Sequence, residues 1–67
     1  MTLAELERMM QTHDWLYGFT DDHRVWEAGR AAERRLSVAC KDLIDAGHKE
    51  EVERLYERYR PEACKWM

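Results

Sequence analysis

The sequence predicts a small all-α domain of three helices, built on an antiparallel helical hairpin. Apolar residues recur at helical spacing in three separate segments, and a short joint, Gly47-His48, connects the last two. The chain has 67 residues and a mass of 8.1 kDa, which suffices for one hydrophobic core and leaves no room for a large active-site cleft. We therefore expect residues 1–67 to form a single helical domain.

The first helix is expected over residues 3–13. Thr2 and Glu5 fit a capping box, because the threonine oxygen can accept from the amide three residues on while the glutamate reaches back to the cap amide. Residues of one helical face then recur three and four positions apart: Leu3, Leu6, Met10 and His13.

The segment 14–21 is expected to be a structured aromatic loop. It breaks the helical period, places Gly18 among aromatic residues, and ends in acids suited to a helix N-terminus. The aromatic residues are Trp15, Tyr17 and Phe19, and the acids are Asp21 and Asp22. Rings at this density either cover the bundle or face a partner.

The second helix is expected over residues 22–46 and carries the strongest pattern in the chain, a heptad-like seam. The seam consists of Val25, Gly29, Ala32, Leu36, Ala39, Leu43 and Ala46, widened by Trp26 and Cys40. Because Gly29 and Ala32 are small, we expect a neighbouring helix to cross tightly near Gly29. A chain this short barely offsets its conformational entropy, so we also expect a symmetric homodimer through this seam.

The third helix is expected over residues 49–59, between a left-handed stop at Gly47 and the break at Pro61. Its inner face is Val52, Leu55, Tyr56 and Tyr59. Near the C-terminus, Trp66 is expected to pack back on the bundle or on a second subunit.

Composition narrows the class of protein. The start of the chain lacks the basic and apolar regions of a signal peptide, and no apolar run is long enough to cross a bilayer. Cys40 and Cys64 allow at most one bridge, and we expect a cytoplasmic protein with both thiols reduced. A net charge of −3 is too mild for a convincing nucleic-acid binder.

Catalysis is not expected, and neither is a cofactor. Ser37 and Cys40 lie within a predicted helix, with no glycine turn to present either as a nucleophile. Two clusters flank the aromatic loop and can converge on a divalent metal if the loop folds back: His13 and Asp14 before it, Asp22 and His23 after it. The simpler interpretation is that Asp21 and Asp22 cap the second helix and Asp14 accepts loop amides.

The aromatic and arginine residues give the candidate binding surface. Tryptophan and tyrosine dominate interface hot spots, and Arg30 and Arg34 share a helical stripe that suits an acidic protein surface or phosphates. Trp26, Tyr56 and Tyr59 are expected to fill the core. The candidate partner-binding residues are Trp15, Tyr17, Phe19, Asp21, Asp22, Arg24, Arg30 and Arg34.

Residues 13–30 resemble a segment of small orphan proteins of tailed phages and prophages. The likeness rests on His13-Asp14-Trp15 before a tyrosine, the Thr20-Asp21-Asp22 cap, Val25-Trp26 before Gly29-Arg30, and the Tyr59-Arg60-Pro61 tail. It covers most of the chain, which departs from the group at Gly18 and Phe19, between the tyrosine and the cap. The resemblance implies an accessory protein that binds a protein stoichiometrically and catalyses no reaction.

Three functions follow as expectations. The first is a non-enzymatic phage-type accessory protein that binds and modulates or inhibits a host protein, including a defence or regulatory protein, in the bacterial cytoplasm. The alternatives are a small dimeric nucleic-acid-associated regulator that presents the arginines of the second helix, and a metal-dependent activity at the two His/Asp clusters.

Overall fold

The computed structural model describes residues 1–62 and 64, and in this part of the chain it is all-helical, with no strand. The all-α, three-helix class that the sequence predicts is thereby confirmed. The expectation for Trp66 lies outside the described residues. The elements are helices α1 (Leu3–Thr12), α2 (His23–Asp45) and α3 (Lys49–Tyr59), and a short 3₁₀ turn, η1 (Tyr17–Phe19).

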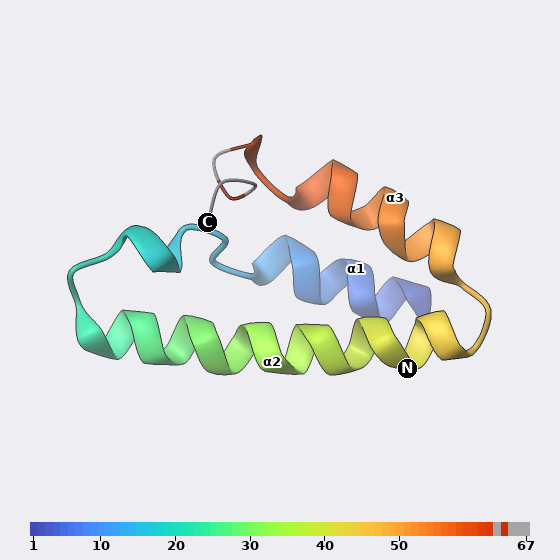
Figure 1. Cartoon of the computed structure of the whole chain (residues 1–67), viewed down its shortest axis with the longest axis horizontal. Helices are drawn as coiled ribbons and strands as arrows, with labels where there is room; N and C mark the ends of the chain where they lie inside the picture. The colour runs from blue at the N-terminus through green and yellow to red at the C-terminus, as the bar shows by residue number, and fades with distance from the viewer. Residues whose placement is uncertain (63, 65–67) are drawn as a thin grey trace.

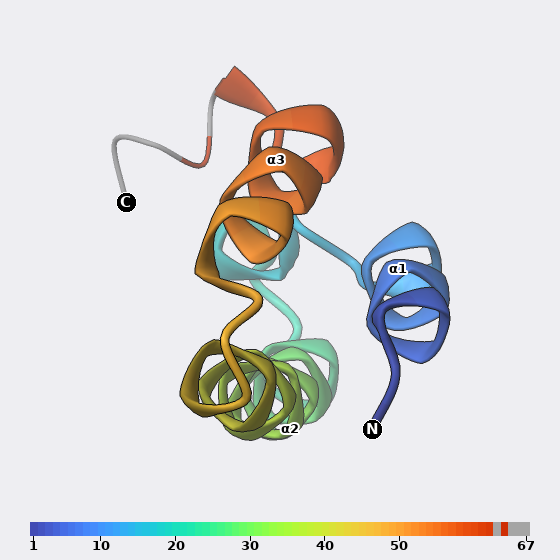
Figure 2. The same cartoon turned by 90° about the vertical axis from the view of Figure 1, so that its right-hand side faces the viewer.

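Helix α2 spans the length of the molecule, and the other elements lie against it (Figure 1). Both α1 and α3 contact α2 and each other, so the three helices form a triangle when viewed end-on (Figure 2). The turn η1 covers the N-terminal part of α2, beyond the ends of α1 and α3. The result is an elongated bundle of 38 × 21 × 16 Å, in which η1 covers one end of α2 and the helices α1 and α3 cover the rest.

Local hydrogen bonds set where the helices begin and end. Thr2 caps α1 by accepting from the Glu5 amide at 3.2 Å, whereas the reciprocal bond from the Glu5 carboxylate is absent among the described residues. Asp22 caps α2 by accepting from the Arg24 amide at 2.9 Å. Gly47 has a φ of +96°, the left-handed conformation that glycine adopts readily. This conformation ends α2 and reverses the chain before α3.

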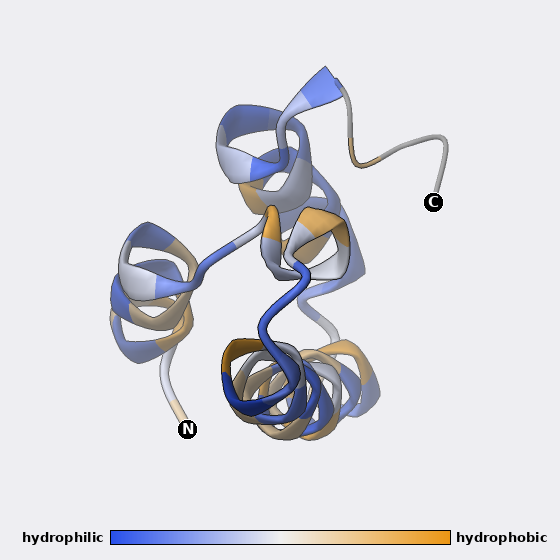
Figure 3. Cartoon of the chain, turned by 90° about the vertical axis from the view of Figure 1, so that its left-hand side faces the viewer, coloured by the Kyte–Doolittle hydropathy of each residue, from blue (hydrophilic) through white to orange (hydrophobic). Residues whose placement is uncertain are grey.

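The core lies where the three helices meet, and their outer surfaces are mostly hydrophilic (Figure 3). Leu6 and Met10 of α1 have no exposed surface. The other buried apolar side chains are Leu36, Ala39, Cys40, Leu43, Val52 and Cys64. Tyr56 and Tyr59 pack against this core, as expected from the sequence.

The middle of the α2 seam is therefore buried inside one chain. Leu36, Ala39 and Leu43 are at most 3% exposed, because α1 and α3 cover them. The surface that we expected to carry a homodimer is occupied intramolecularly. A dimer that keeps this fold has to use another face.

The close approach at Gly29 is made by a side chain. A methyl group at Gly29 would overlap the Cβ and Cγ atoms of Tyr17, so it is the ring of Tyr17 that lies on this buried glycine. The predicted tight helix crossing at this position is wrong. Small residues in a seam permit any close neighbour, and here the neighbour is η1.

Among the described residues, no helix is both long enough and apolar enough to cross a membrane.

Candidate functional site

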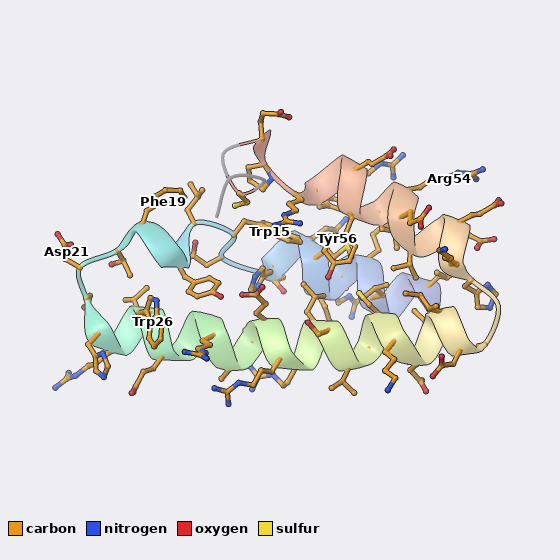
Figure 4. The ribbon with its side chains drawn as sticks, viewed as in Figure 1. Trp15, Phe19, Asp21, Trp26, Arg54 and Tyr56 are labelled. Atoms are coloured by element: carbon orange, nitrogen blue, oxygen red, sulfur yellow. The ribbon has the colours of Figure 1, made fainter. Side chains whose placement is uncertain are left out.

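The three aromatic residues of the loop divide into two groups. Trp15 and Tyr17 are half-buried, whereas Phe19 is 62% exposed. Figure 4 shows Trp15 beside Tyr56 over the middle of the molecule, and Phe19 projecting from η1 away from α2. The sequence left open whether these rings cover the bundle or face a partner, and in the structure Trp15 and Tyr17 cover the bundle whereas Phe19 is exposed.

Trp15 fixes the loop to the core. Its indole Nε1 donates to the carbonyl of Met10 at 3.0 Å, which uses a carbonyl at the C-terminal end of α1. Its ring meets His13 and Tyr56 edge-on, with ring centroids 4.8 and 6.0 Å apart respectively. A tryptophan that is packed against the core and hydrogen-bonded in this way is structural.

Tyr17 fixes η1 to α2. Its ring lies on Gly29, and its hydroxyl donates to the carboxylate of Glu33 one turn further along α2. The ring centroid of His13 lies 6.0 Å from that of Tyr17. Gly29 and Glu33 are four residues apart, so both point toward η1 from the same face of the helix.

Short-range hydrogen bonds hold the rest of the loop. The Asp14 carboxylate accepts from the Leu16 amide at 3.1 Å, and the Leu16 carbonyl accepts from the Phe19 amide at 3.0 Å. The Thr20 hydroxyl accepts from the Asp22 amide at 3.2 Å. The loop is thus a defined turn whose backbone is satisfied locally.

This turn presents two exposed apolar side chains. Leu16 is 49% and Phe19 62% exposed, and side chains three residues apart in a 3₁₀ turn eclipse each other. We call Leu16 and Phe19, with the exposed Asp21 and with the exposed Arg24 in the first turn of α2, the η1 surface. Leu16 was missed from the sequence. Its three-residue spacing from Phe19, just after the turn-forming Asp14, is the signal that could have identified it.

The remaining candidates form a separate group on α2. The Arg30 guanidinium lies 5.2 Å from the ring centroid of Trp26, and His23 stacks on the same indole with centroids 6.2 Å apart. Arg30 and Arg34 are exposed and line a shallow hollow with Trp26. Trp26 is therefore outside the core cluster, and its predicted core position is wrong.

The proposed metal ligands do not converge. His13 packs against Trp15, Asp14 accepts from the Leu16 amide, Asp22 caps α2, and His23 pairs with Glu27 at 2.9 Å. In residues 1–62 and 64, no three His, Cys, Asp or Glu side chains are arranged to hold a metal ion. The loop folds toward the core through Trp15 instead of bringing the two clusters together.

A cleft of about 420 Å³ lies beside the inward-pointing rings. It is where the end of α1, the loop, α2, α3 and the segment after α3 meet. Its lining residues are His13, Trp15, Tyr17, Glu33, Leu36, Tyr56, Arg60 and Cys64. We call this the aromatic cleft.

Two buried thiols contact residues of this cleft, and one of them, that of Cys64, lines it. The Cys40 Sγ donates to the Tyr56 hydroxyl at 3.5 Å, and the Cys64 Sγ donates to the Trp15 carbonyl at 2.8 Å. Both cysteines are free. Burial raises the pKa of the Cys40 thiol and, together with the hydrogen bond from Cys40, raises the pKa of the Tyr56 phenol above its ordinary value of 10.0. Both groups are therefore neutral at physiological pH, which suits packing better than nucleophilic chemistry.

Comparisons of the chain with protein-family models, with curated proteins and with solved structures find no match.

Proposed function

We propose that this chain is a non-enzymatic binding protein whose η1 surface docks onto a partner protein. The observation that carries the proposal is the exposure of Phe19 and Leu16, three residues apart on a turn that Trp15 and Tyr17 fix to the bundle. Large apolar side chains held in one conformation bind at low entropic cost, because little freedom is lost on docking.

The composition of the surface fits a protein partner. Besides its two apolar side chains it contains Asp21 and Arg24, which are exposed, of opposite charge, and close in sequence to the turn. An apolar centre with a polar rim is the usual organisation of a protein interface. The opposite charges on the rim would orient the partner more than they would strengthen its binding.

The resemblance to small proteins of tailed phages and prophages supports a more specific role. On that basis we propose that the partner is a host or defence protein of the bacterial cytoplasm, and that binding modulates or inhibits it. Stoichiometric binding needs a surface and no catalytic centre, which fits a chain whose two thiols are buried.

The test is affinity capture from a bacterial host lysate, with three tagged chains compared at equal concentration. Phe19→Ser removes the centre of the η1 surface, and Ile44→Ser is the matched control, since Ile44 is 40% exposed near the far end of α2. We expect wild type and Ile44→Ser to retain the same stoichiometric protein and Phe19→Ser to lose it. Equal thermal melts must first show that the variants are folded.

Two results would contradict this proposal. One is capture that Phe19→Ser leaves intact. The other is retention of nucleic acid in place of protein, with an affinity that falls steeply as salt is added. That second result would favour the arginines Arg30 and Arg34, and with them a nucleic-acid-associated regulator.

We also propose that any homodimer forms through the outward face of α2. Val38 is 70% exposed there, and Arg34 and Asp42 lie one turn before and after it. In an antiparallel symmetric contact centred on Val38, each arginine would meet the aspartate of the other copy. A solution mass that stays at 8.1 kDa at every concentration would contradict a dimer, and Val38→Glu should abolish one.

A further inference from the structure

The aromatic cleft carries an inference that goes beyond protein docking, because its walls are fixed. Trp15 is held by its bond to Met10, Tyr17 by its bond to Glu33, and Tyr56 by the thiol of Cys40. The rings thus keep their positions whether or not the cleft is filled. A preorganised aromatic wall binds flat apolar groups with little loss of side-chain conformational entropy.

Two opposite charges lie in the same cleft without pairing. Glu33 and Arg60 both line it, and both are exposed. Neither makes an ion pair with any described residue. Within residues 1–62 and 64, each also retains hydrogen-bonding capacity, because Glu33 accepts from Tyr17 through one oxygen and Arg60 donates to the Cys64 carbonyl through one nitrogen.

The two charges come from different parts of the chain that line the cleft. Glu33 projects from the middle of α2, and Arg60 follows the last residue of α3. Tyr56 lies near both, since the charges of both act on its hydroxyl in opposite senses. The floor is apolar, formed by the buried Leu36 and Cys64. A cleft lined by one anion, one cation and aromatic rings is complementary to a ligand that carries an ammonium group, a carboxylate and a ring.

We propose that the aromatic cleft binds a small zwitterion with an aromatic body, of the chemical class of a free aromatic amino acid. Glu33 holds its ammonium group, Arg60 holds its carboxylate, and Trp15 and Tyr56 contact its ring. A volume of about 420 Å³ is within the range of small-molecule sites. Arginine suits the carboxylate because its planar guanidinium can donate two parallel hydrogen bonds.

The test uses three compounds with the same aromatic body but different charged groups. L-phenylalanine carries both groups, phenethylamine lacks the carboxylate, and 3-phenylpropionate lacks the ammonium. Each is titrated into the full ¹⁵N-labelled chain, and binding is followed at the Trp15 indole and Arg60 side-chain signals. We expect saturable shifts at these signals, with phenylalanine binding about tenfold tighter than either analogue, the equivalent of one good charged contact.

Matched variants assign each charge to its residue. Glu33→Gln should weaken phenylalanine and phenethylamine binding but leave phenylpropionate unchanged. Arg60→Gln should weaken phenylalanine and phenylpropionate binding but leave phenethylamine binding unchanged. Arg60→Lys should lose less affinity than Arg60→Gln, because it keeps the charge. Arg54→Gln, in the separate groove between α1 and α3, should change nothing.

The proposal is overturned if no compound gives saturable shifts at millimolar concentration, or if the three bind equally well. It is also overturned if phenethylamine alone matches phenylalanine, which would make the cleft a cation site. Thermal melts of each variant separate loss of binding from loss of fold. Since Phe19 is not in the cleft, failure here leaves the docking proposal untouched.

Discussion

Gly29 and Gly47 are special for different reasons, and the difference is measurable. Gly29 has ordinary helical geometry but lies under Tyr17, whereas Gly47 has a left-handed φ of +96° and open space around it. Gly29→Ala should cost about 1–3 kcal/mol, because the overlapping atoms lie at the base of the tyrosine side chain and η1 must move. Gly47→Ala should cost about 1–2 kcal/mol through backbone strain. Chemical denaturation measures both.

A second substitution separates the two causes. In a Tyr17→Gly background, Gly29→Ala should cost almost nothing, since the obstructing Cβ and ring are both gone and alanine is the better helix former by about 1 kcal/mol. The cost of Gly47→Ala should be the same in both backgrounds. If Gly29→Ala were as costly without the ring, Tyr17 would not lie on Gly29 as described.

The raised pKa of Tyr56 predicts a loss of stability in alkali. The folded chain keeps the phenol proton above pH 10.0, where the unfolded chain releases it, so the folded state binds more protons and the free energy of unfolding falls as pH rises. This contribution is fully present below that pH. Denaturation in urea between pH 8 and pH 12 should show the part of the fall due to Tyr56 beginning near pH 10, above the part due to Cys40, which begins near the ordinary thiol pKa of 9.0.

Tyr56→Phe is the control for this pH dependence. Phenylalanine keeps the ring against Trp15 but has no proton to lose. Its stability should fall less steeply than that of wild type above pH 10.0. An unchanged slope would mean that Tyr56 titrates alike in the folded and unfolded chain.

At the scale of elements, the two adjacent acids before α2 have different roles. Asp22 caps the helix, whereas Asp21 makes no hydrogen bond or ion pair with the described residues. Asp22→Ala should lower the free energy of unfolding by about 1 kcal/mol, because the Arg24 amide loses its acceptor. Asp21→Ala should change it by less than about 0.5 kcal/mol. Equal losses would indicate a general electrostatic effect of the pair in place of a specific cap.

The helices were the most predictable part of this chain. Expected and observed bounds differ by one residue at the end of the first helix, and by one at each end of the second. Capping residues and a left-handed glycine are local signals, so a sequence contains them directly. The hydrogen-bonded turn at Tyr17–Phe19 was not predicted, because it depends on the tertiary contacts of Trp15 and Tyr17.

Side-chain partners were less predictable than elements. Gly29 indicated a close neighbour but not which one, since a helix backbone and a tyrosine ring both require a residue without a Cβ at this position. Trp26 has core spacing on α2, yet α1 and α3 do not reach that part of the helix, so the indole packs between His23 and Arg30. Both errors arise because periodicity identifies a face and not what covers it.

At the scale of the whole molecule, the loop serves two purposes. Its inward rings attach η1 to the bundle, and its outward side chains form the η1 surface. The same bundle forms the aromatic cleft beside the inward rings. In contrast, α1 and α3 of the same chain bury the middle of the α2 seam. For this reason we propose that a partner binds at the η1 end of the molecule.

This division between Trp15 and Phe19 is best tested by urea denaturation of Trp15→Ala and Phe19→Ala side by side. We expect Trp15→Ala to lose about 3 kcal/mol or more, because a core-packed indole and its hydrogen bond to Met10 are removed. Phe19→Ala should stay within about 0.5 kcal/mol of wild type, since its ring is largely in water. A stable Trp15→Ala together with an unfolded Phe19→Ala would contradict the inward and outward assignment, and with it the proposed docking surface.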